Sequence, residues 1–322
     1  MLRRIKMLDT IVNTCVEVKP GQQVLVVVDD RSLSVKIGRQ VAEACGLAGA
    51  EVVMSIMPPR KYNGQEPPSS IAQAMQVCDT YIQVCERPSL THTNAGKAAR
   101  EKGIKFVTMG ARYGEDFFDR EISVADLNLI KERSERVAEI VSCANLARVT
   151  SSYGTDLRMS LEGRKGIGLH PLSGAAIISL PDYAEVAVSP VEGSTEGILV
   201  TEGGVRGWEL PLREPLRLSV KRGRVTEVSG PEDYAERVKR LLATDENASN
   251  CAAELGIGTT HTMPKNIMWS GVVLGTIHIA VGRNNDIGGE TYSKIHNDLM
   301  IYRPTVWLDD LCLIEDGELK VP

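Results

Sequence analysis

The chain has 322 residues, more than a single domain of about 100–200 residues usually contains, so we expect two domains. Hydrophobic residues make up 43% and charged residues 25%, an ordinary globular composition that argues against long disordered regions. The net charge of −5 excludes a general attraction to nucleic acid or to an anionic membrane surface. Aromatic residues are only 4%, which argues against binding single strands by base stacking.

The cysteines and the N-terminus indicate the compartment. Seven cysteines are scattered along the chain without a CxxC pair, which is typical of free thiols and not of a disulfide framework or a zinc ribbon. Residues 1–9 predict an amphipathic helix and not a signal peptide. No apolar run approaches the roughly 20 residues that span a bilayer. We therefore expect a cytoplasmic protein without a membrane partner.

The first 145 residues alternate between strand and helix patterns. Apolar runs of strand length are followed by helical patterns, as where Leu33, Ile37 and Val41 recur at a spacing of four before Gly46. The predicted strands cover 23–28, 51–56, 80–84 and 104–109, and the later predicted helices 70–77, 93–102 and 124–143. Strands that are apolar on both faces favour a parallel sheet between helices. We predict an α/β domain over residues 1–145.

The pattern changes after residue 146. Short alternating strands and glycine turns dominate, as in residues 216–220 followed by Arg222-Gly223, and one helix is predicted at 231–243. We predict an α+β domain rich in antiparallel strands over residues 146–322, and expect it to be the metal-binding catalytic domain for the reasons below.

Common enzyme motifs are absent from the sequence. The first strand runs into Asp29-Asp30, whose carboxylates would repel the pyrophosphate that a glycine-rich turn binds. No GxxxxGK[ST] loop, GxSxG elbow or HExxH helix occurs. A nucleotide-dependent enzyme, a serine hydrolase with the common elbow and a zincin are therefore disfavoured.

Two of the five histidines lie in apolar strands near the end of the chain. His296 and Asp298 are two residues apart, so on a strand both project from the same face and can bind one cation. A hydrogen-bonded pair on a solvated edge is the alternative. His278 lies inside the apolar run 272–281, where its ring needs a partner, either a backbone carbonyl or a metal.

Two acids are in a similar position. Glu185 precedes Val-Ala-Val, and Glu254 precedes an apolar, glycine-rich strand. A buried carboxylate must be paired or coordinated. Each residue alone is ambiguous, but three acids and two histidines in strands of one domain favour a divalent-metal site. Carboxylate and imidazole donors suit zinc, cobalt, manganese or ferrous iron, and five ligands leave room for two ions, as in metal-dependent hydrolysis.

At these residues the sequence resembles the aminopeptidase T family of metallopeptidases. The resemblance is carried by Pro-x-x-Glu-Val and Pro-x-Glu-Gly within 181–193, a glutamate before a strand, a histidine in a glycine-bounded strand, and a final His-x-Asp-Leu-Met-Ile. It implies a homodimeric or higher homo-oligomeric two-metal hydrolase with the metals in the second domain. The implied ligands are Glu185, Glu254, His278, His296 and Asp298, with Glu254 bridging the ions.

A relative in the same superfamily, 2,5-dihydroxypyridine 5,6-dioxygenase, is a ring-opening ferrous enzyme of similar size. It shares the His-x-Asp pair, but has a histidine at the place of Glu254. This chain departs from the peptidases at Asn285, where they have a tyrosine, and Tyr292 is a candidate substitute from the following loop. The spacer between His278 and His296 is also shorter than in the peptidases, and both changes fall where substrate is expected to bind.

The leading hypothesis is therefore a metal-dependent hydrolase of a C–N bond, an aminopeptidase or an amidase of a small or cyclic substrate, with metal-bound hydroxide as the nucleophile. Glu254 and Glu185 are the expected catalytic carboxylates, and Glu192 or Glu185 is expected to accept the proton. His261, Asn285 and Tyr292 are the candidate contacts to a small molecule or short peptide.

The alternative is a mononuclear Fe(II) ring-cleaving dioxygenase of a hydroxypyridine-type substrate, with His278 or His261 beside His296 and Asp298 as ligands. A metal-stabilised binding protein is the third hypothesis. His92 and His170 have no predicted role.

Overall fold

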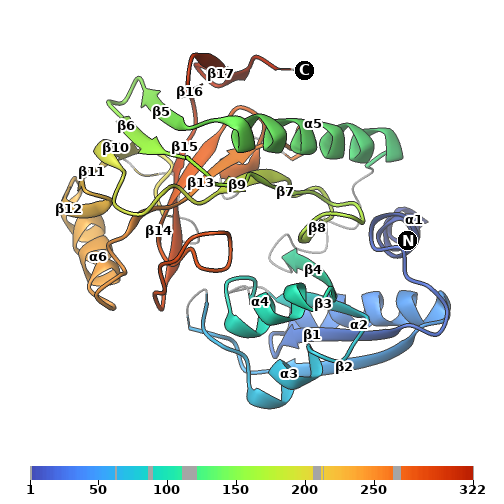
Figure 1. Cartoon of the computed structure of the whole chain (residues 1–322). Coiled ribbons are helices and arrows are strands. Elements are labelled where there is room, and N and C mark those ends of the chain that lie inside the picture. Colours follow the sequence, from blue (N-terminus) through green and yellow to red (C-terminus); the bar gives the residue numbers. More distant parts are fainter. Residues whose placement is uncertain are drawn as a thin grey trace. The chain divides into compact units, whose positions relative to one another are not determined.

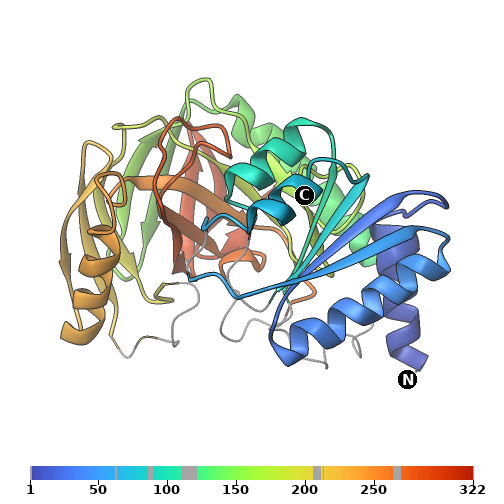
Figure 2. The same cartoon turned by 90° about the horizontal axis from the view of Figure 1, so that it is seen from below.

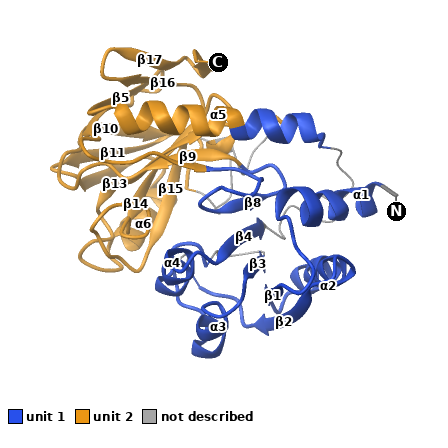
Figure 3. Cartoon of the chain, turned by 45° about the vertical axis from the view of Figure 1, so that its right-hand side comes forward, with its two compact units in different colours: residues 1–131, 169–183 blue, residues 132–168, 184–322 orange. Residues whose placement is uncertain are grey.

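The computed structural model of the chain describes residues 2–61, 64–85, 90–110, 122–205, 212, 214–263 and 270–321. It divides into two compact units, residues 1–131 with 169–183 and residues 132–168 with 184–322 (Figure 3). This division differs from the predicted boundary near residue 145, because the chain returns to the first unit at 169–183 and adds a strand to its sheet there.

The first unit is built on a parallel sheet of five strands in the order β2-β1-β3-β4-β8 (Figure 1). The strands are β1 (Gln23–Asp29), β2 (Glu51–Met57), β3 (Thr80–Cys85), β4 (Lys105–Gly110) and β8 (Ile178–Leu180). Every residue of β3 is buried, and so is every residue of β1 after Gln23. The sheet is therefore covered on both faces, as the continuous apolar runs predict.

Helices cover the two faces of this sheet. Figure 2 shows α2 along one side of the strands and α3 and α4 along the other. The helices of this unit are α1 (Leu2–Asp9), a π-helical turn (Thr10–Cys15), α2 (Ser32–Leu47), α3 (Ser69–Ala74) and α4 (Asn94–Glu101). Ile37 and Val41 of α2 belong to one hydrophobic core with Val26 and Ile82 of the sheet. Within the part of the chain that the structure describes, no helix is long and apolar enough to cross a membrane.

The second unit contains two antiparallel sheets, here called the large sheet and the small sheet. The large sheet has the order β12-β11-β10-β6-β5-β16-β17-β18, and the small sheet the order β15-β14-β13-β9-β7. The strands of the large sheet are β5 (Leu146–Ser151), β6 (Asp156–Ser160), β10 (Glu196–Thr201), β11 (Leu216–Lys221), β12 (Arg224–Ser229), β16 (Pro304–Leu308), β17 (Leu311–Glu315) and β18 (Glu318–Leu319).

The small sheet carries most of the polar residues that the sequence singles out. Its strands are β7 (Ile167–Leu169), β9 (Glu185–Val188), β13 (Cys251–Gly258), β14 (Ile277–Gly282) and β15 (His296–Ile301). Helix α5 (Val124–Cys143), helix α6 (Glu232–Leu242) and a 3₁₀ turn (Ser270–Val272) complete the described elements.

Side-chain alternation divides the small sheet into an apolar and a polar face. Leu255 and Ile279 belong to one hydrophobic core together with Leu157 and Leu199 of the large sheet. The residues that flank Leu255 on β13 and Ile279 on β14 project from the other face, because successive side chains on a strand alternate between faces. The predicted α/β domain followed by an α+β domain rich in antiparallel strands is confirmed.

Burial predicts a large difference between two isoleucines of the first sheet. Ile82 on β3 is 0% exposed, whereas Ile56 on the edge strand β2 is 55% exposed. We expect Ile82→Ala to lower the free energy of unfolding by about 2–5 kcal/mol, because it leaves a cavity in a packed core. The matched control Ile56→Ala should cost less than about 1 kcal/mol. Urea denaturation measures both values, and equal losses would contradict this account of the core.

Candidate metal centre

The predicted ligands come from four neighbouring strands of the small sheet. These are Glu185 on β9, Glu254 on β13, His278 on β14, and His296 and Asp298 on β15. Glu254 and Asp298 are both paired with Ala280, one on each side of it. Residues opposite one another on paired strands project from the same face, and so do residues two apart on one strand. Glu254, Asp298 and His296 therefore share one face of the sheet.

The same register brings in the other two residues. His278 is opposite Gly256, and Glu185 is opposite Gly258. Both glycines lie an even number of residues from Glu254 on β13, so their partners project from the face that Glu254 occupies. All five residues are buried, each at most 5% exposed. The sheet thus gathers three acids and two histidines at one buried place.

An irregularity in β13 sets the position of Glu254. The pairing with β14 shifts between Cys251 and Glu254, and Ala252 within this bulge has a φ of 59°. A left-handed conformation is costly for alanine, and such residues cluster at functional sites. A bulge adds residues to one strand and so changes which residue lies opposite a given partner. Here it brings Glu254 opposite Ala280, in line with Asp298.

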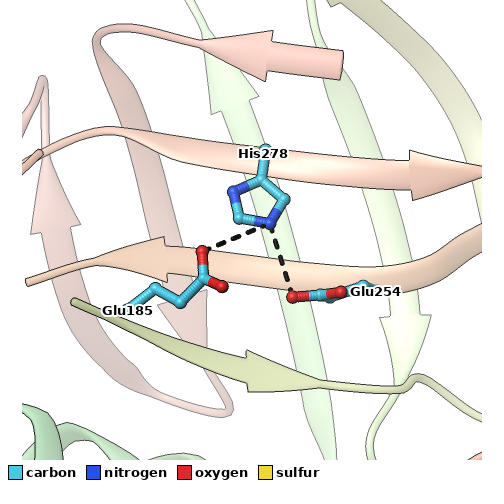
Figure 4. Close-up of side chains that lie close together, drawn as sticks. All are labelled: Glu185, Glu254 and His278. Carbon is cyan, nitrogen blue, oxygen red and sulfur yellow. Dashed lines mark hydrogen bonds and ion pairs between the residues drawn. The ribbon is translucent and has the colours of Figure 1, made fainter. Parts of the chain in front are cut away.

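Glu254 lies between two groups of ligands. Its Oε1 is 3.4 Å from Nε2 of His278, and this nitrogen is 3.6 Å from Oε2 of Glu185 (Figure 4). Its Oε2 is 3.0 Å from Nε2 of His296, which is 3.4 Å from Oδ1 of Asp298. Each oxygen of one carboxylate therefore faces a different histidine, and each histidine has one further acid beside it.

Backbone carbonyls set the orientation of both imidazoles. Nδ1 of His278 donates to the carbonyl of Gly271 at 3.1 Å, and Nδ1 of His296 donates to the carbonyl of Arg283 at 2.8 Å. The Nε2 atoms then face the carboxylates. A neutral imidazole would direct a lone pair at these oxygens, so the arrangement requires either a second proton on each ring or a cation between the groups.

The pKa values express the same requirement. Burial alone lowers the pKa of His278, but the charges of Asp298, Glu185 and Glu254 outweigh it and raise that pKa to about 9. Burial likewise opposes ionisation of His296, yet its contacts with Asp298 and Glu254 raise its pKa well above the usual value. Burial raises the pKa of Glu254, but hydrogen bonds to both histidines bring it to about 2. The carboxylates favour positive charge at this place.

The donor set fits a metal ion. One ligand atom from each of Glu185, Glu254 and His278 lies within 4.8 Å of the others. An imidazole whose other nitrogen donates to a carbonyl is a usual ligand of zinc, manganese, cobalt and ferrous iron. Carboxylates are the other usual ligands of these ions. His296 and Asp298 continue this group of acids and imidazoles beyond Glu254.

Glu192 lies in a different environment. Its Oε1 accepts hydrogen bonds from Nδ2 of Asn284 at 2.8 Å and from the N–H of Glu290 at 2.7 Å, and its Oε2 pairs with Arg164. Burial opposes ionisation of this carboxyl, but these donors and the charge of Arg164 lower its pKa overall. Both oxygens are therefore engaged by neighbouring groups.

The predicted substrate contacts are also held by neighbours. Nδ1 of His261 is 3.2 Å from Nη1 of Arg133, a cation, so this nitrogen accepts the hydrogen bond. Oδ1 of Asn285 accepts from Nε of Arg283 at 3.1 Å, and the guanidinium of Arg283 lies 5.0 Å from the centroid of the Tyr292 ring. Asn285 and Tyr292 thus both contact Arg283. Their contact with a substrate remains a prediction.

Sequence reasoning missed several residues that shape the centre. Gly256, Gly271 and Arg283 contribute space or a backbone carbonyl, and Asn284 and Arg164 bind Glu192. Backbone contributions leave no mark in residue type. A signal was available in the loop after β14, where the polar run 283–286 follows directly on a buried apolar strand.

Gly256 is required by the ring of His278. A Cβ at this position would lie 2.0 Å from Cε1 and 2.1 Å from Nε2 of that ring. We expect Gly256→Ala to displace His278 and to weaken zinc binding by at least about 10-fold, measured by titration of metal-stripped protein. In the control Gly46→Ala, the Cβ would meet nothing within 4 Å. Unchanged zinc affinity in Gly256→Ala would contradict the placement of His278.

The pKa values predict how the stability of metal-stripped protein depends on pH. A raised histidine pKa contributes stability that is complete below about pH 6.5 and is lost as the pH rises through about 9. The low pKa of Glu254 contributes stability above about pH 4.5 that is lost as the pH falls through about 2. We expect the Tm of the metal-stripped protein, measured by scanning fluorimetry, to fall as the pH rises from 6.5 to 9.

Zinc affinity should rise over the same interval, because protons and metal ions compete for the two imidazoles. A Tm of the stripped protein that stays level or rises from pH 6.5 to 9 would count against the assigned interactions.

Comparison with known proteins places the chain in a family. The sequence profile of the 2,5-dihydroxypyridine 5,6-dioxygenase family matches residues 4–321. No curated protein sequence matches the chain.

Two solved structures share the fold over nearly the whole chain. The 2,5-dihydroxypyridine dioxygenase from Pseudomonas putida has a TM-score of 0.79 and 15% identity, covering 99% of this chain and 97% of its own. AmpT from Thermus thermophilus has a TM-score of 0.67 and 18% identity, covering 99% of both chains. Identities this low establish the fold alone. The profile spans almost every residue, and the chain belongs to the 2,5-dihydroxypyridine 5,6-dioxygenase family.

Proposed function

We propose that the protein is a metal-dependent hydrolase of a C–N bond, acting on a short peptide or on a small or cyclic amide. The observation that carries this proposal is the position of Glu254, whose two oxygens face His278 and His296 separately at 3.4 and 3.0 Å. A carboxylate between two His–acid pairs is suited to bridge two ions. Paired ions are typical of enzymes that hydrolyse amides and esters.

The side chains divide into two ligand groups around Glu254. Glu185 and His278 would hold one ion, and His296 and Asp298 the other. When bound, such ions supply a water molecule of lowered pKa and a Lewis acid for the substrate carbonyl. The buried sheet face excludes bulk water, and the carbonyls of Gly271 and Arg283 keep both imidazoles in the orientation that metal binding needs.

Glu185 is the better candidate to accept the proton of the attacking water. It lies within the centre, 3.6 Å from Nε2 of His278. The carboxylate of Glu192 is instead held by Asn284, Glu290 and Arg164. We therefore assign the general base to Glu185 where it does not ligate an ion, and a positioning role to Glu192.

We propose that His261, Asn285 and Tyr292 contact the substrate. Arg133 fixes the ring of His261 through Nδ1 and also donates to the carbonyl of Thr259 at 2.9 Å. This hydrogen bond assigns the proton of a neutral His261 to Nε2, which makes that atom a donor. A donor of this kind suits a carbonyl or carboxylate group on a small substrate.

A second candidate is a ferrous dioxygenase that opens a hydroxypyridine-type ring. The family profile over residues 4–321 favours it. It requires a single ion, with His296, Asp298 and one further histidine as ligands, so that Glu254 would not bridge. Metal number and dependence on oxygen distinguish the two candidates.

Removing the bridging carboxylate should abolish both metal binding and turnover. We expect Glu254→Ala to bind less than one ion per chain and to lose at least about 10³-fold in kcat/KM, because Glu254 serves both ligand groups. The control Glu227→Ala changes an exposed acid of β12 and should leave both values unchanged. Metal content by plasma mass spectrometry and assays on aminoacyl amides and small cyclic amides measure the effects.

The number of bound ions and the dependence of turnover on molecular oxygen separate the two candidates. Two ions per chain and hydrolysis at equal rates with and without oxygen would support the hydrolase. One iron per chain and cleavage of hydroxypyridines only in the presence of oxygen would overturn it in favour of the dioxygenase. Full turnover by Glu254→Ala would exclude the assignment of the centre itself.

A further inference from the structure

The loop between β14 and β15 orients one half of the metal centre. His296 opens β15, and its Nδ1 donates to the carbonyl of Arg283, the first residue after β14, at 2.8 Å. The N–H of Arg283 donates to the carbonyl of Ile295 at 2.8 Å. The position of the Arg283 backbone therefore helps to set where the His296 ring points. His278 depends on a different segment, through Gly271.

Glu192 holds this loop from outside the metal centre. Oε1 of Glu192 accepts from the side chain of Asn284, which follows Arg283 directly, and from the N–H of Glu290 farther along the loop. Asn284 also accepts from the N–H of Thr291 at 2.8 Å. One carboxylate oxygen thus ties the start of the loop at Asn284 to its middle at Glu290.

The carboxylate is itself fixed. Arg164 pairs with Oε2 of Glu192 and donates to the carbonyl of Gly288 in the same loop. The side chains of Arg164 and Glu192 are only 15% and 27% exposed, so water screens the pair less than it screens a surface ion pair. Glu192 and Arg164 therefore bind the loop at three residues, Asn284, Gly288 and Glu290.

The loop leaves no freedom for Asn284 to take another position cheaply. A Cβ on Gly289 would lie 2.1 Å from the carboxamide carbon of Asn284, so this side chain packs directly on the backbone of Gly289. Arg283 is 0% exposed and anchors the start of the loop in the interior. A shift of the Asn284 backbone would move the carbonyl of Arg283, because the two residues share one peptide group.

We propose that Glu192 is a positioning residue for the half of the metal centre formed by His296 and Asp298, acting through Asn284 and the carbonyl of Arg283. This inference rests on the proposed two-metal function. It assigns to Glu192 selective control of one ion, because the hydrogen bond that orients His278 comes from Gly271, which none of these contacts touches. Second-shell partners of this kind change metal affinity by about 10–100-fold.

Stepwise metal titration tests the proposal. In Glu192→Ala, we expect one of the two zinc-binding steps to lose about 10–100-fold in affinity, while the other changes by less than about threefold. Glu192→Gln retains an oxygen acceptor for Asn284 and Glu290, so it should lose less than Glu192→Ala. The control Glu162→Ala removes an exposed acid two residues from Arg164 and should change neither step.

A second measurement does not depend on bound metal. In metal-stripped protein labelled with ¹⁵N-histidine, the Nδ1–H signal of His296 should exchange with water faster in Glu192→Ala than in the unchanged chain, and that of His278 should not. Equal weakening of both zinc steps, or unchanged exchange at His296, would overturn the positioning role. A single zinc step in the unchanged chain would instead overturn the two-metal function, and the exchange measurement would still test Glu192.

Discussion

The centre depends on one physical constraint: three carboxylates and two imidazoles are buried together, and their charges must balance without water. Glu254 lies between His278 and His296, and each ring is held by a backbone carbonyl so that its Nε2 faces an acid. Like charges in a low dielectric repel strongly, so the acids require protons on the imidazoles or a cation among the ligands. The strand register and the loop after β14 maintain this arrangement.

Glycines of the small sheet leave room for the side chains of the candidate centre. On β13, Gly256 leaves room for the ring of His278, and Gly258 lies opposite Glu185. On the reverse face, Leu255 and Ile279 belong to the core of the unit. One side of the same strands thus packs into the hydrophobic core, while the other carries the polar candidate ligands. Preorganisation of this kind is what a metal centre needs from its supporting residues.

Several features were predictable because they depend on local pattern. The helix predicted at 124–143 has those boundaries as α5, and its stripe of Leu127, Val137 and Val141 is buried. The candidate ligands could be found because charged residues inside apolar strands conflict with burial. The capture of residues 178–180 by the first sheet could not be predicted, because a short strand of this kind is selected by its neighbour β4 and not by its own residues.

By itself, the sequence determined the two kinds of fold, the donor chemistry and the exclusion of the common nucleotide, serine and zincin motifs, since these follow from residue type and periodicity. Only the tertiary structure decided that Glu254 lies between two histidines, through the bulge at Ala252, and that Glu192 is engaged by Arg164 and Asn284. The physical reason is that strand register, bulges and backbone carbonyls depend on pairing between distant segments. No local pattern encodes them.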